Sequence, residues 1–73
     1  MSISREETKA LVAALLAQIE LACQDMRPEA ARKVAELARD LGDKTGNQEW
    51  LRTALVWERN ARRRLERAPG AGA

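Results

Sequence analysis

The 73-residue sequence contains no histidine, tyrosine or phenylalanine, and only one cysteine. Cys23 cannot form an internal disulfide, and a single thiol without histidine cannot build a zinc cage. Without histidine, no side chain has an unperturbed pKa near neutral pH that would suit a general base. No glycine-rich phosphate loop and no nucleophile motif occurs. The sequence therefore predicts no catalytic residue, no metal site and no cofactor, and we expect the protein not to be an enzyme.

The longest apolar run is too short to cross a membrane. Residues 10–23 contain only two polar side chains, Gln18 and Glu20, but a span needs roughly 20 apolar residues. The run also lacks the flanks of a secretory signal, because Glu6 and Glu7 precede it. A lone thiol, which we expect to be buried, fits a reducing compartment. These features predict a cytoplasmic protein with no membrane partner.

Hydrophobic periodicity predicts an all-α protein. Helices are expected at about residues 4–26, 28–41 and 47–67, and no strand pattern occurs. The predicted architecture is a small three-helix bundle or an extended helical hairpin, completed by oligomerisation. Residues 1–67 form the single helical domain and residues 68–73 a flexible tail. The first helix carries an apolar seam with coiled-coil spacing, formed by Thr8, Val12, Leu15, Ile19, Ala22 and Met26.

Local signals predict where these helices begin and end. Ser4 stands three residues before Glu7, which is capping-box spacing, and Pro28 suits the first position of a helix. Gly42 is the expected C-terminal cap of the second helix. Thr45 or Asn47 can cap the third helix.

The first helix is apolar nearly all round, although a helix that meets a core on one side needs only an apolar stripe. A domain of about 60–70 residues buries only about 60% of its unfolded surface, so small folds need a stabilising device such as oligomerisation. We therefore expect self-association as a symmetric homodimer with the first helix at its centre. The predicted oligomer or partner interface consists of Leu11, Val12, Leu15, Leu16, Ile19 and Cys23.

Positive charge is concentrated near the C-terminus. Residues 1–58 carry 8 basic and 10 acidic side chains, whereas residues 59–73 carry 5 arginines and one glutamate. These arginines could contact an acidic protein or a nucleic acid, although Arg62 is also spaced to pair with Glu58 or Glu66. The predicted anion-contacting set is Arg59, Arg62, Arg63, Arg64 and Arg67.

Two other hypotheses concern the predicted third helix. A helix-turn-helix would present Gln48, Glu49, Trp50 and Leu51 to the bases, and these side chains are unsuited to that role. Trp50 and Trp57 lie on one helical face and are expected in the core, yet tryptophan is also enriched at interface hot spots. Either ring is therefore a candidate interface aromatic.

The sequence favours a non-enzymatic helical protein that binds another protein. Such a protein would act as a regulator, inhibitor or adaptor of a larger assembly, as a homodimer. Two alternatives stay open at this point. One is a nucleic-acid-binding regulator that uses the arginine cluster, with affinity that falls steeply with salt. The other is a structural subunit of a complex.

Overall fold

The computed structural model describes residues 4–67 and contains three α-helices in that range. They are α1 (Arg5–Gln24), α2 (Pro28–Thr45) and α3 (Gln48–Arg67), and the described residues contain no strand. The predicted all-α class is therefore confirmed. The predicted tail at residues 68–73 lies outside the described residues.

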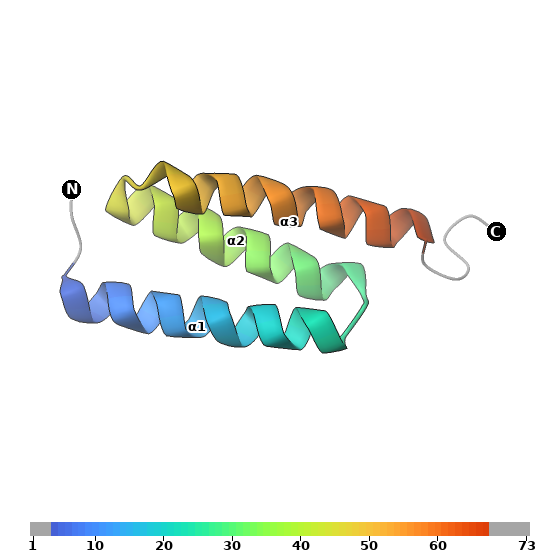
Figure 1. Ribbon diagram of the computed structural model, residues 1–73, viewed down its shortest axis with the longest axis horizontal. Coiled ribbons are helices and arrows are strands. Elements are labelled where there is room, and N and C mark those ends of the chain that lie inside the picture. Colours follow the sequence, from blue (N-terminus) through green and yellow to red (C-terminus); the bar gives the residue numbers. More distant parts are fainter. Residues whose placement is uncertain (1–3, 68–73) are drawn as a thin grey trace.

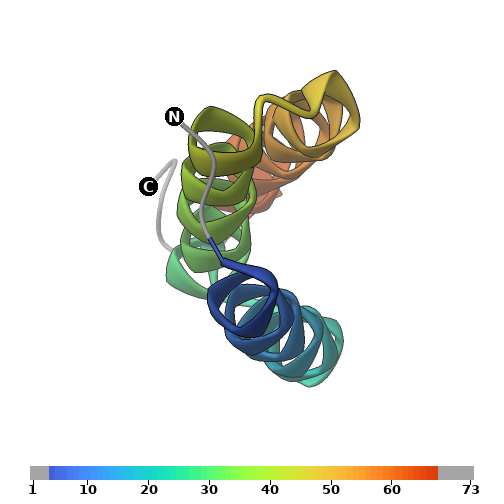
Figure 2. The ribbon, with the colours of Figure 1, turned by 90° about the vertical axis from the view of Figure 1, so that its left-hand side faces the viewer.

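The three helices form an open arrangement with α2 in the middle (Figure 1). Both α1 and α3 pack against α2, but no Cα atoms of α1 and α3 lie within 8 Å of each other in the described part of the chain. Viewed end-on, α1 and α3 are set at an angle around α2 rather than closing onto each other (Figure 2). Because the backbone of α1 approaches only that of α2, most residues of α1 remain exposed.

Helix α1 begins and ends through local hydrogen bonds. Ser4 is extended and its hydroxyl accepts the backbone N–H of Glu7 at 3.1 Å, as the capping-box spacing predicts. The helix ends at Gln24, two residues earlier than predicted, because Asp25 is extended and Arg27 precedes a proline, which disfavours helical backbone. Met26 therefore lies outside the helix and is exposed, so its predicted place in the apolar seam of this helix is wrong.

Helix α2 is longer than predicted. It continues through Gly42 to Thr45, and Gly46 is the C-terminal cap with a φ of 73°, a left-handed conformation that glycine adopts without steric cost. The predicted cap at Gly42 is therefore wrong. The turn to α3 is short, and Asn47 caps α3 by accepting the backbone N–H of Glu49 at 2.9 Å.

Small residues line the contact between α2 and α3. Gly42 is buried, and a Cβ atom at this position would lie 2.8 Å from Cγ of Leu51. Other small residues recur on these two helices at helical spacing, and each is buried: Ala31, Ala35 and Ala38 on α2, and Ala54 and Ala61 on α3. Small side chains allow two helices to approach closely, so α2 and α3 form the tightly packed half of the fold.

The core contains few large side chains. Within residues 4–67, the largest that are fully buried are Leu15 from α1 and Val34 and Leu41 from α2. Half-buried side chains pack around this cluster and extend it: Leu11, Val12, Ile19, Ala30, Leu37, Trp50 and Trp57. The stability of the chain therefore depends on a small number of apolar contacts centred on α2.

Candidate interaction surfaces

The predicted interface on α1 divides into a buried part and an exposed part. Leu15 is 0% exposed and Leu11 packs against the core, so neither belongs to the uncovered face. Leu16, by contrast, is 56% exposed. Including Leu15 in a surface interface was wrong, because α2 covers this side of the helix.

The uncovered face of α1 carries a continuous apolar stripe. Leu16 and Cys23 are exposed, and Val12 and Ile19 between them are half-buried against the core. Spacings of four, three and four residues place all four side chains on one flank of the helix. The predicted burial of Cys23 is wrong, because its side chain is exposed near the C-terminal end of α1. We call these four residues the α1 edge stripe.

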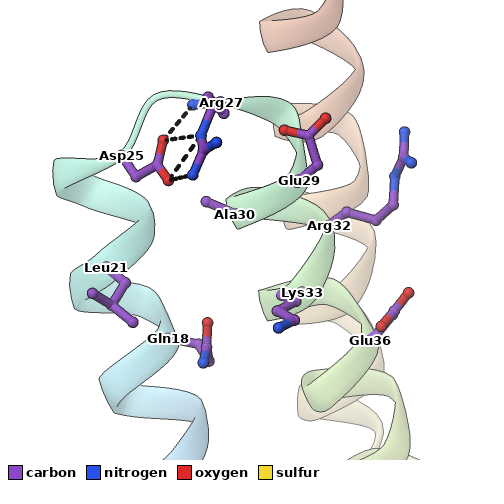
Figure 3. A pocket seen from close by; sticks show the side chains of 9 residues that line it. All are labelled: Gln18, Leu21, Asp25, Arg27, Glu29, Ala30, Arg32, Lys33 and Glu36. Atoms are coloured by element: carbon purple, nitrogen blue, oxygen red, sulfur yellow. Dashed lines mark hydrogen bonds and ion pairs between the residues drawn. The ribbon is translucent and has the colours of Figure 1, made fainter.

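The opposite flank of α1 borders a shallow depression against α2 (Figure 3). This depression has a volume of about 430 Å³, and Gln18 and Leu21 line its α1 side. Side chains of both charges line the rest, among them Lys33 and Glu36. At its end, Arg27 donates to the carboxylate of Asp25 at 2.9 Å, and this hydrogen bond lowers the pKa of Asp25 below its ordinary value. Because charges of both signs line the depression, its electrostatic field favours neither an anionic nor a cationic ligand.

Arg64 differs from the other arginines of the predicted cluster. Its guanidinium donates to the backbone carbonyl of Asp25 at 2.9 Å and lies 5.8 Å from the ring centroid of Trp57. Arg64 therefore connects the C-terminal part of α3 to Asp25, the C-cap residue of α1. Because Arg64 is half-buried and engaged in these contacts, it serves the fold rather than a partner.

Both tryptophans pack against the core cluster and remain half-buried. The Arg64 guanidinium lies over the ring of Trp57, so this ring contacts both the core and the arginine that joins α3 to Asp25. Each ring therefore contributes to folding. Neither is among the strongly exposed apolar side chains, which include Leu16, Leu21, Leu55 and Val56.

The remaining four arginines of the cluster are exposed: Arg59, Arg62, Arg63 and Arg67. Glu58, an expected partner of Arg62, pairs instead with Arg39 of α2 at 2.6 Å. Arg32 of α2 joins this group, because it lines a small depression between α2 and α3 together with Arg62. Sequence reasoning missed Arg32. The antiparallel register that places Gly42 beside Leu51 would have indicated that Arg32 lies level with the last turns of α3.

Within residues 4–67, no three His, Cys, Asp or Glu side chains are grouped closely enough to hold a metal ion. No helix of the described part is long and apolar enough to cross a membrane. The fold and these surfaces define a small, open three-helix protein. No protein-family model, curated protein or solved structure matches the chain.

The contacts of Arg64 with the Asp25 carbonyl and the Trp57 ring predict a contribution to stability. Arg64→Ala should lower the free energy of unfolding by about 1–2 kcal/mol, since it removes a hydrogen bond and the contact over Trp57. Urea denaturation followed by tryptophan fluorescence measures the change. Arg63→Ala is the matched control and should change stability by less than about 0.5 kcal/mol, because Arg63 is exposed. Equal effects of the two substitutions would contradict a structural role of Arg64.

Proposed function

We propose that this protein acts by binding another protein chain, without catalysis, and that its working form is a homodimer joined through the α1 edge stripe. As a homodimer it would regulate, inhibit or connect the components of a larger assembly. The observation that carries the proposal is the packing of α1. The backbone of this helix approaches that of α2 but not that of α3, and Leu16 and Cys23 stay exposed beside the half-buried Val12 and Ile19.

Burial of the α1 edge stripe supplies the driving force for association. Removing apolar surface from water contributes roughly 25 cal/mol per Å². A domain of this size has little spare core, so covering an apolar helix flank adds to the stability of the chain as well as joining two copies. A twofold axis brings the same stripe of both copies together, and Leu16 and Ile19 lie at the middle of the stripe, where the axis passes.

Two leucines of α1 provide a matched test. Leu16 lies in the α1 edge stripe and is 56% exposed, whereas Leu21 lies on the opposite flank and is 53% exposed. Leu16→Glu should raise the dimer dissociation constant at least about tenfold, since it places two carboxylates near the axis. Leu21→Glu should leave the constant unchanged within about threefold. Sedimentation equilibrium at micromolar concentrations measures both.

The position of Cys23 gives a second readout of the same interface. As the only cysteine of the chain, Cys23 reports directly on the covering of the α1 edge stripe. Its alkylation should slow as protein concentration rises through the dimer dissociation constant, and Leu16→Glu should abolish this dependence. Two outcomes would refute the dimer. One is a folded monomer at ~100 μM, which is about 100-fold above the expected micromolar range. The other is an equal weakening of the dimer by Leu16→Glu and Leu21→Glu.

A further inference from the structure

We propose that the exposed arginines of α3, together with Arg32 of α2, bind the phosphate backbone of nucleic acid. This inference is independent of the homodimer, because it concerns another surface. We call the five residues the basic face: Arg32, Arg59, Arg62, Arg63 and Arg67. Arg64 is excluded, because its guanidinium is engaged by the carbonyl of Asp25 and the ring of Trp57.

The first observation is that two helices bring guanidinium groups to one depression. Arg32 and Arg62 line a hollow of about 260 Å³ between α2 and α3, which Ala61 and Leu65 also border. Glu58 lines it as well, but its carboxylate is held by Arg39 at 2.6 Å. The carboxylate that lines this depression is thus already paired with Arg39, and an anion from outside the chain could bind Arg32 and Arg62 together.

The second observation is that no arginine of the basic face forms an ion pair within residues 4–67, although Glu66 lies among them in sequence. The ion pairs of the described residues are Asp25–Arg27, Arg39–Glu58 and Asp40–Lys44, and none includes a member of the basic face. All five arginines are exposed. Repulsion between them opposes folding slightly, and an extended polyanion would relieve it.

The extent of the basic face fits a polyanion better than a single carboxylate. Arg59 and Arg67 are eight residues apart, which corresponds to roughly 12 Å along the helix. Duplex DNA carries one charge per roughly 1.7 Å of its axis, so about seven phosphates lie alongside this length. Guanidinium groups bind phosphate oxygens with paired hydrogen bonds. Because phosphate contacts carry no base information, we expect binding that does not depend on sequence.

The test uses the full chain and a fluorescently labelled 20-base-pair DNA duplex. Anisotropy should show binding at 50 mM salt, and affinity should fall at 200 mM salt with a logarithmic slope of about −2 to −4. The triple variant Arg32→Ala/Arg62→Ala/Arg63→Ala should bind at least about tenfold more weakly and with a slope reduced by about two or more. All three side chains are exposed, so circular dichroism should report an unchanged helical content.

A control variant separates the basic face from net charge. Arg5→Ala/Lys9→Ala/Arg52→Ala also removes three positive charges, and these residues are exposed near the other end of the helices. It should retain affinity within about threefold. Equal weakening by both triple variants, or no binding to the wild type at 50 mM salt, would overturn the proposal. So would a polyglutamate chain that competes as well as the duplex at equal charge, because the basic face would then be a site for acidic protein.

Discussion

Replacing Leu15 by alanine should lower the free energy of unfolding by about 3–5 kcal/mol, the largest change expected from any single truncation on α1. Leu15 is completely buried and belongs to the cluster that also contains Val34 and Leu41. Deletion of a buried leucine side chain loses its transfer free energy and leaves a cavity, because close-packed neighbours relax only partly. A chain of this size has a total stability of roughly 4–11 kcal/mol. The substitution therefore removes a large share of it.

Thermal and urea denaturation at concentrations well below the dimer dissociation constant measure the effect. The midpoint temperature of Leu15→Ala should fall by at least about 10 °C. Leu16→Ala is the matched control, because its side chain is mostly exposed, and its monomer stability should change by less than about 0.5 kcal/mol. Similar losses in the two variants, or an unaltered Leu15→Ala, would mean that α2 does not cover α1 as described.

The contrast between these adjacent leucines shows what sequence patterns can and cannot predict for α1. The start of the helix depends on Ser4 and Glu7, which are three residues apart, so a local rule was sufficient. The apolar pattern also placed Leu15 and Leu16 together on an apolar surface. It placed Leu15 in the seam and Leu16 beside it, yet it assigned both to the predicted interface, because their burial depends on how many helices pack against α1 and from which side. The cluster that covers Leu15 contains side chains of α2 and α3, and this is a tertiary property.

The arginines illustrate the same limit in the candidate binding surface. Charge counting along the chain identified the five arginines after residue 58 as a group. It could not single out Arg64, whose hydrogen-bond acceptor, the carbonyl of Asp25, is 39 residues away in sequence. Nor could it find Arg32, which lines the depression with Arg62 only because α2 and α3 run side by side. Contacts across helices decide which charges are engaged and which remain available.

Gly42 and Gly46, near the turn between α2 and α3, differ in backbone conformation in a way that the sequence did not predict. The sequence predicts Gly42, and not Gly46, as the C-terminal cap of the second helix. In the structure, Gly46 takes the left-handed φ of 73° and Gly42 is helical and buried. Gly42 is required for a different reason, which is the close approach of α3.

Gly42→Ala should therefore destabilise the protein by about 1–2 kcal/mol, although alanine is normally the better helix former by about 1 kcal/mol. The added Cβ atom would lie 2.7 Å from Cδ2 of Leu51, 2.8 Å from its Cγ and 3.2 Å from its backbone nitrogen. The side chain of Leu51 can move in part, but the backbone at the start of α3 must also shift. Overpacking of this kind typically costs 1–3 kcal/mol, which outweighs the gain in helix propensity.

A double-mutant cycle with Leu51→Ala tests that cause. Removing the leucine side chain eliminates two of the three close contacts, so Leu51→Ala should cost less in the Gly42→Ala background than in the wild type. Gly46→Ala should also lose about 1 kcal/mol, because its backbone is left-handed, but nothing lies within 4 Å of its Cβ position. Its loss should therefore be independent of Leu51. If Gly42→Ala were stabilising, or if its effect added to that of Leu51→Ala without coupling, the close contact between α2 and α3 would not be the reason for this glycine.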